Sequence, residues 1–186
     1  MAVMTRGISM RIILGFTILL SLAGCGTAPV GDFTLEVIQF DAPSKKFDAD
    51  LYSVVLAYNL PAKGRELGPN VEIPIQWRDF LKASLDESKF FDTASALSAD
   101  VIMTINLVKL PIAGGAMQTE LAATYSIVDR GTENELFFSN IRSKSDIPFS
   151  YAFNGQTRTQ ESVKRAITDN VSGFLNDFRN FIQTRP

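Results

Sequence analysis

The apolar residues from position 33 onward first predict two strands and a helix. Residues 33–40 alternate between apolar and polar side chains over most of their length, which is the period of a strand. Residues 52–60 are apolar almost throughout, which indicates a strand buried on both faces. Residues 75–88 repeat apolar positions at helical spacing, as expected of a face that packs on a sheet. The stripe of this helix consists of Trp77, Phe80, Leu81, Ser84 and Leu85.

Three further strands and a long helix are predicted in the second half of the chain. Residues 99–110 and 119–129 alternate, and a polar turn leads into a third strand at 135–143. Because their turns are short, these strands should form an antiparallel meander. The last helix should span residues 159–182. Its stripe consists of Val163, Ile167, Val171, Phe174, Phe178 and Phe181 or Ile182.

The order of elements is therefore ββ-α-βββ-α. It predicts an α+β fold, with a mostly antiparallel sheet and two amphipathic helices packed on one face. Thr157 and Gln160 have the spacing of a capping box, which places the start of the last helix close to them.

The first 24 residues have the pattern of a secretory signal peptide. Arg6 and Arg11 are the only charged residues before Cys25, and both precede the apolar run 12–20. A basic region followed by a short apolar region is typical of such signals. A membrane-spanning helix needs about 20 apolar residues, and this run is too short.

The sequence Leu22-Ala23-Gly24-Cys25 resembles the lipobox of bacterial lipoproteins. The resemblance implies that the Cys25 thiol receives a diacylglyceryl group, that cleavage falls between Gly24 and Cys25, and that the new amine is then acylated. Two or more acyl chains anchor a protein stably in a bilayer. Gly26 stands where members of this class retained in the inner membrane have Asp, so the resemblance places the protein in the outer membrane, facing the periplasm.

These features divide the chain into a signal peptide (1–24), a lipidated Cys with a short tether (25–32) and one periplasmic domain (33–186). The domain has the usual size for a single core. Cys25 is the only Cys, so no intramolecular disulfide can form. Cleavage would remove two of the 18 basic residues and none of the 20 acidic ones, which leaves a formal net charge of −4. That charge gives no support to nucleic-acid binding.

The order of elements also resembles the YajG-type outer-membrane lipoproteins. A strand opens at 99–103, after a predicted helix and Phe90-Phe91. A second strand ends at 127–129, and 136–139 return after a polar turn. The pattern is similar, more loosely, to auxiliary lipoproteins of ABC-type lipid transporters and to activator lipoproteins of penicillin-binding proteins. The resemblance implies the fold and the compartment, and it transfers no site residue other than Cys25.

Residue types argue against catalysis and against bound cofactors or metals. The chain has no His, and lipidation would consume its one thiol, so His-dependent and Cys-dependent mechanisms are excluded. No phosphate-binding glycine loop is present. Asp48 and Asp50 are the remaining candidates for a carboxylate-dependent hydrolase, but they lie in a polar stretch and are better interpreted as solvated acids.

Two segments are candidates for binding. Phe149, Tyr151 and Phe153 alternate, so an extended chain would place all three on one side. They either form a contact surface for a protein partner or lipid, or they seat the segment against the last helix. Burial is the commoner fate of such rings and is favoured here. The Pro- and Gly-rich loop 61–74 is either a second contact site or a plain surface connection.

The sequence thus predicts a non-enzymatic, membrane-anchored binding or accessory subunit of the cell envelope. Its partners would be the membrane, through Cys25, and an envelope protein or a lipid. A lipid-handling component of a transport system is the alternative, and it would need a cleft lined by Phe and Leu between the sheet and the helices.

Overall fold

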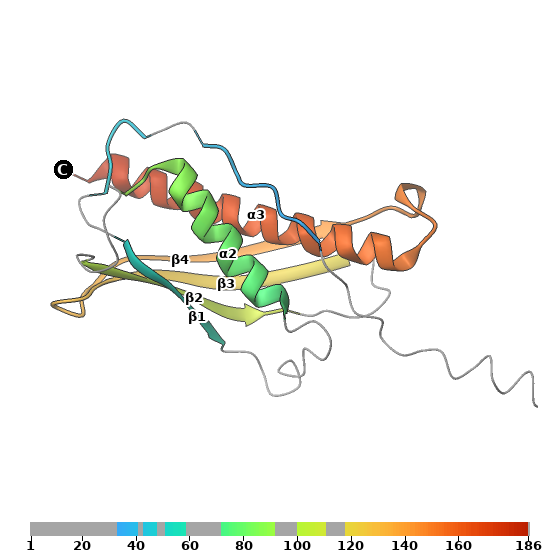
Figure 1. The fold of residues 1–186 in the computed structure, drawn as a ribbon, viewed down its shortest axis with the longest axis horizontal. Coiled ribbons are helices and arrows are strands. Elements are labelled where there is room, and N and C mark those ends of the chain that lie inside the picture. Colours follow the sequence, from blue (N-terminus) through green and yellow to red (C-terminus); the bar gives the residue numbers. More distant parts are fainter. Residues whose placement is uncertain are drawn as a thin grey trace, which may run out of the picture.

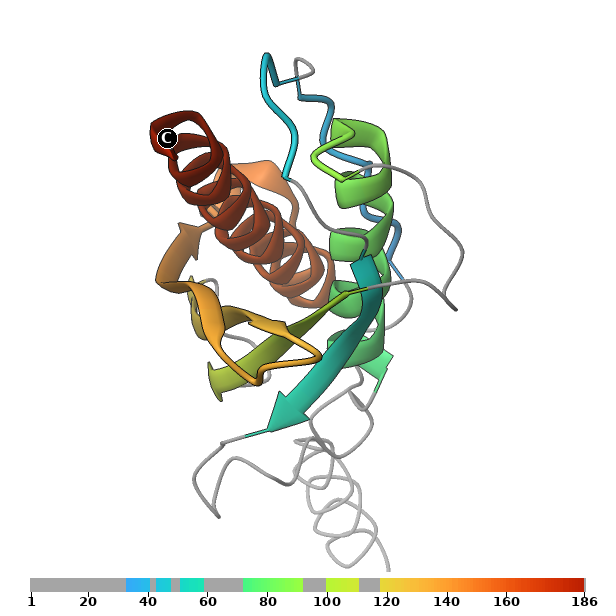
Figure 2. The same cartoon turned by 90° about the vertical axis from the view of Figure 1, so that its left-hand side faces the viewer.

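The computed structural model describes residues 33–40, 43–47, 51–58, 72–91, 100–110 and 118–185. The elements are β1 (Leu51–Tyr58), α2 (Glu72–Ser88), β2 (Val101–Lys109), β3 (Gln118–Asp129), β4 (Glu135–Asp146), the 3₁₀ turn η3 (Phe149–Tyr151) and α3 (Gly155–Thr184). Both α-helices lie on the same face of the sheet (Figures 1 and 2). The predicted α+β class is therefore confirmed.

The four strands form one sheet in the order β1-β2-β3-β4. β2, β3 and β4 pair antiparallel, as the predicted meander requires. β1 pairs parallel to β2. Parallel neighbours need a long crossover, and α2 lies between these two strands in the chain. The sheet is thus mixed, with antiparallel pairing at two of its three strand contacts.

The predicted strand at 33–40 is wrong. These residues, called the leading segment below, belong to no strand of the sheet and run over the helices (Figure 1). The backbone N–H of Ile38 donates to the Ser84 hydroxyl of α2 at 3.3 Å. The Phe40 ring lies 6.3 Å from the Phe90 ring and beneath the Arg179 guanidinium of α3. The alternating pattern reflects packing against helices rather than pairing with a strand.

Several element boundaries also differ from the sequence predictions. α2 begins at Glu72 rather than 75, because Pro74 falls in the first turn, where a missing N–H costs no helical hydrogen bond. β4 continues past Ser143 to Asp146. α3 begins at Gly155 and is capped by the Asn154 side chain, which accepts from the Gln156 N–H at 2.9 Å. The predicted capping box therefore does not form.

The core lies between the sheet and the two helices. α2 packs against β1, while α3 packs against β3 and β4. The predicted stripes of both helices are buried, apart from Phe181, which is partly exposed. An aromatic cluster fills the end of the core near the last turns of α3. Its members are Phe47, Phe90, Phe91, Phe137, Phe174, Phe178 and Phe181.

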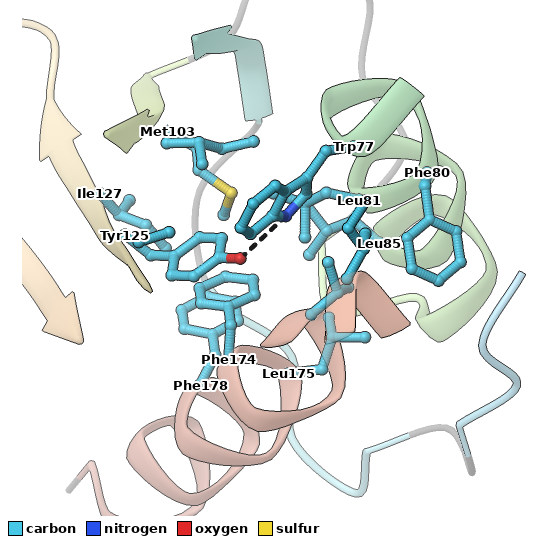
Figure 3. Close-up of a cluster of buried hydrophobic side chains, with 14 of the residues drawn as sticks. Trp77, Phe80, Leu81, Leu85, Met103, Tyr125, Ile127, Phe174, Leu175 and Phe178 are labelled. Atoms are coloured by element: carbon cyan, nitrogen blue, oxygen red, sulfur yellow. Dashed lines mark hydrogen bonds between the residues drawn. The ribbon is translucent and has the colours of Figure 1, made fainter. Parts of the chain in front are cut away.

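A buried chain of hydrogen bonds crosses this core. The Trp77 indole N–H donates to the Tyr125 hydroxyl at 3.2 Å, which Figure 3 shows as a dashed line. Tyr125 in turn donates to the Asn170 side-chain oxygen at 2.7 Å. The Asn170 amide donates to Ser143 and to the Ile141 carbonyl, both at 3.2 Å. One network therefore joins α2, β3, β4 and α3, and it satisfies polar groups that burial would otherwise penalise.

Tyr125→Phe should lower the free energy of unfolding by about 1–3 kcal/mol, because the indole N–H and the Asn170 oxygen lose their buried partner. Burial also raises the pKa of Tyr125. Above about pH 10 the unfolded tyrosine loses its proton while the folded one keeps it, so this contribution to stability falls as pH rises. Urea denaturation should therefore show the gap between wild type and Tyr125→Phe narrowing above pH 10. Tyr151→Phe, at a half-exposed ring, should change stability by less than about 0.5 kcal/mol at neutral pH. An equal effect of both substitutions would contradict the network.

Candidate functional site

The candidate site is the turn between β4 and α3. Phe149, Tyr151 and Phe153, called the aromatic surface below, are 58%, 47% and 93% exposed. The burial that the sequence favoured for these rings is therefore wrong, although Phe149 and Tyr151 still contact the last helix through two of its arginines. The alternative prediction, that they form a contact surface, agrees with their exposure.

The sequence predicts an extended backbone at this turn, but the structure has a 3₁₀ turn there. η3 covers Phe149–Tyr151, and the Tyr151 N–H donates to the Pro148 carbonyl at 3.0 Å. The Phe149 and Phe153 rings consequently meet edge to face, with centroids 5.9 Å apart. Alternation along the sequence grouped the three rings, but it is the hydrogen-bonded turn that brings Phe149 and Phe153 together.

Two arginines of α3 support the aromatic surface from below. Arg158 is buried, and its guanidinium donates to the Ala152 carbonyl and lies 4.7 Å from the Phe149 ring centroid. Arg165 lies 5.5 Å from the centre of the Tyr151 ring. A cation over an aromatic face is attractive. These contacts hold the turn and its exposed rings against the part of α3 that runs from Arg158 to Arg165.

A shallow pocket of about 300 Å³ lies beside Tyr151. The leading segment forms one wall and the first turns of α3 form the other. Its lining consists of Phe33, Thr34, Glu36, Tyr151, Thr157, Gln160, Glu161 and Lys164. The pocket therefore joins the first described residue of the domain to the aromatic surface.

The charges of this pocket are paired. Lys164 Nζ lies 3.9 Å from a Glu36 carboxylate oxygen. Arg165 donates to Glu161 at 2.7 Å, and this hydrogen bond raises the pKa of Arg165 above its ordinary value. Each carboxylate of the pocket thus faces a cation.

Metal-binding and membrane-spanning features can be checked in the described residues. They contain no group of three or more acidic, His or Cys side chains close enough to hold a metal ion. No helix in this part of the chain has the length and apolar character needed to cross a bilayer.

Several predicted positions lie outside the described residues. They include Gly24 and Cys25, the tether 25–32, Asp48, Asp50 and the part of the predicted loop from 61 to 71. The lipidation of Cys25 and the division into signal, tether and domain therefore stay predictions. Positions 72–74 of the predicted loop belong to the first turn of α2.

Comparisons with known proteins bear on the fold. No known family model and no curated protein matches the sequence. Among solved structures, the hypothetical protein CT253 from Chlamydia trachomatis is 7% identical, with a TM-score of 0.50 over 76% of this chain and 100% of that one. Protein XCC0632 from Xanthomonas campestris is 12% identical, with a TM-score of 0.49 over 81% and 97%. Lipoprotein GNA1162 from Neisseria meningitidis is 14% identical, with a TM-score of 0.41 over 71% and 99%. At such identities the likeness concerns the fold alone.

Two parts of the site were missed from the sequence. Arg158 and Arg165 stand on a long helix with several other charged residues, and nothing in their spacing marks them as partners of aromatic rings. Phe33 was assigned to a strand of the sheet, so its position beside Tyr151 could not be foreseen. The one available signal was Pro148, which favours a turn directly before the first ring.

Proposed function

We propose that this protein is a lipid-anchored lipoprotein of the cell envelope that serves as a non-enzymatic accessory or binding subunit. The observation that carries this proposal is the sequence Leu22-Ala23-Gly24-Cys25 directly after an apolar signal region. An acylated Cys25 would hold the domain at a bilayer through a tether of only a few residues. Gly26 favours the outer membrane, with the domain in the periplasm.

The proposed binding role is supported by the aromatic surface. Exposed large apolar residues elsewhere in the described residues stand singly, as Val55 and Val108 do, and single exposures of this kind are normal. Three exposed rings within five residues are a different case, because such patches mark sites of contact. The absence of His from the whole chain and the paired carboxylates of the pocket support a non-enzymatic role.

The lipid-handling alternative has weaker support. The pocket beside Tyr151 is lined mostly by polar and charged side chains, with Phe33 and Tyr151 as its two rings. Sites that enclose acyl chains are lined predominantly by apolar side chains. The resemblance to YajG-type lipoproteins agrees with an accessory role at the outer membrane and leaves the pathway open.

The proposal is tested by purifying the full chain, tagged at its carboxyl end, from crosslinked and detergent-solubilised membranes. We expect mass spectrometry to find a diacylglyceryl group on Cys25 and one envelope protein in stoichiometric amount. A bound lipid without a protein partner would instead support lipid handling. An unmodified Cys25 or catalytic turnover by the purified protein would overturn the proposal.

A further inference from the structure

We propose that the aromatic surface lies in the membrane interface and orients the domain, with the amino end of α3 toward the bilayer. This inference rests on the proposed lipid anchor at Cys25. It adds a second point of contact, formed by Phe149, Tyr151 and Phe153, and it commits to a lipid surface as the occupant of these rings.

The first argument is the reach of the tether. Seven residues separate Cys25 from Phe33, and the eight residue steps between the two span at most about 28 Å. Phe33 and Tyr151 line the same pocket. The chain therefore enters the domain directly beside the aromatic surface, and the anchor must lie within one tether length of this point.

The second argument is the length of α3. The ion pair between Lys164 and Glu36 shows that the leading segment passes the first third of this helix. Lys164 is nine residues from Gly155, about 14 Å along the helix, but 21 residues from Arg185, about 32 Å. A tether of this length is too short for the bilayer to lie at the carboxyl end of α3. The amino end of this helix is well within the reach of the tether.

The third argument is the chemistry of the exposed groups. Aromatic rings favour the headgroup level of a bilayer, where a ring can bury its apolar part. Phe153 is 93% exposed, and its ring meets only the edge-to-face neighbour Phe149 among the ring contacts of the described residues. The formal charge of the mature chain is −4, so attraction to anionic lipids does not explain membrane contact. We therefore assign the contact to apolar burial of the rings.

The arginines beneath the rings fit the same location. Arg158 and Arg165 approach Phe149 and Tyr151 from α3, on the side of the rings that faces the domain. Arginine side chains at a membrane interface keep the charged group at the polar boundary while their stems lie along apolar surface. The rings thus form the outermost layer, and the cations lie one layer further from the hydrocarbon.

The test uses the full chain, processed in a bacterial host, purified in detergent and reconstituted into phosphatidylethanolamine and phosphatidylglycerol vesicles. Phe153→Trp places a fluorophore in the aromatic surface. Phe138→Trp is the matched control, because Phe138 is also an exposed Phe, at 54%, but lies near the start of β4, where the neighbouring Phe137 contacts Phe181 at the far end of α3. The fluorescence of wild type comes from the buried Trp77 and gives the background against which the added Trp is measured.

We expect brominated acyl chains to quench the added Phe153→Trp fluorescence by at least about twofold, because a ring at the headgroup level reaches the upper acyl carbons. Phe149→Trp should be quenched as well, and Phe138→Trp should not. Equal quenching at positions 153 and 138, in vesicles that carry the protein, would overturn the membrane contact while the anchor stands. Protein that does not float with the vesicles, or that lacks acyl groups on Cys25, would instead overturn the proposed function.

Discussion

Replacing Cys25 with Ala should abolish acylation of the protein completely. In the proposed modification the Cys25 thiolate is the nucleophile that would accept the diacylglyceryl group, and an Ala side chain offers none. Without that modification the lipoprotein pathway has no substrate for cleavage after Gly24, so the precursor should accumulate with residues 1–24 still attached. Labelling with radioactive palmitate, followed by mass spectrometry of the amino-terminal peptide, measures both effects.

Two variants separate the thiol chemistry from other effects of substitution. Cys25→Ser keeps the size of the side chain and should fail as fully as Cys25→Ala. Gly26→Ala keeps the thiol and should be acylated and cut like wild type. Because the uncut precursor retains the apolar run 12–20, acylation and chain length are better readouts than sedimentation with membranes. A normal-length, palmitate-labelled product from Cys25→Ala would refute the assigned anchor.

Phe178→Ala should destabilise the domain by about 3–5 kcal/mol, the cost of removing a buried Phe and leaving a cavity. Phe178 has no exposed surface. Its ring centroid lies 5.1 Å from that of Phe137, 5.4 Å from those of Phe47 and Phe91, and 5.8 Å from that of Phe174. One truncation therefore removes contacts to three separate parts of the fold, and urea denaturation followed by circular dichroism measures the loss.

Phe138→Ala is the control for this experiment. It removes the same atoms from a ring that is 54% exposed on β4, so stability should change by no more than about 1 kcal/mol. Similar destabilisation by the two substitutions would mean that the aromatic cluster does not carry the core. If the unfolding free energy of Phe178→Ala fell less steeply with urea concentration than that of wild type, the substitution would have made the native state less compact rather than left a simple cavity.

The elements that follow a strict period could be predicted from the sequence, and their burial was largely correct. The helical stripe through Trp77 and Leu81 packs as expected, and so does that through Ile167 and Phe174. Pairing direction could not be predicted for β1, because nothing local to residues 51–58 specifies whether the next strand of the sheet lies parallel or antiparallel.

The leading segment shows why a strand pattern can mislead. Alternation says only that every second side chain meets an apolar surface, and two packed helices offer such a surface as well as a neighbouring sheet does. The candidate site shows the opposite error. Its three rings were expected to be buried because aromatic residues usually are. Their exposure depends on the η3 turn and on Arg158, which pattern reasoning does not detect.

The path of the leading segment has a mechanical consequence. The segment runs beside α3 from the pocket at Phe33 toward Phe40, which lies against Arg179. With the bilayer at the amino end of that helix, any pull on the anchor would act along the segment. The contacts at Glu36, Ile38 and Phe40 would then bear the load together, in shear, instead of peeling away one at a time. A domain tied to a moving membrane in this way should resist extraction by force better than its equilibrium stability alone would suggest.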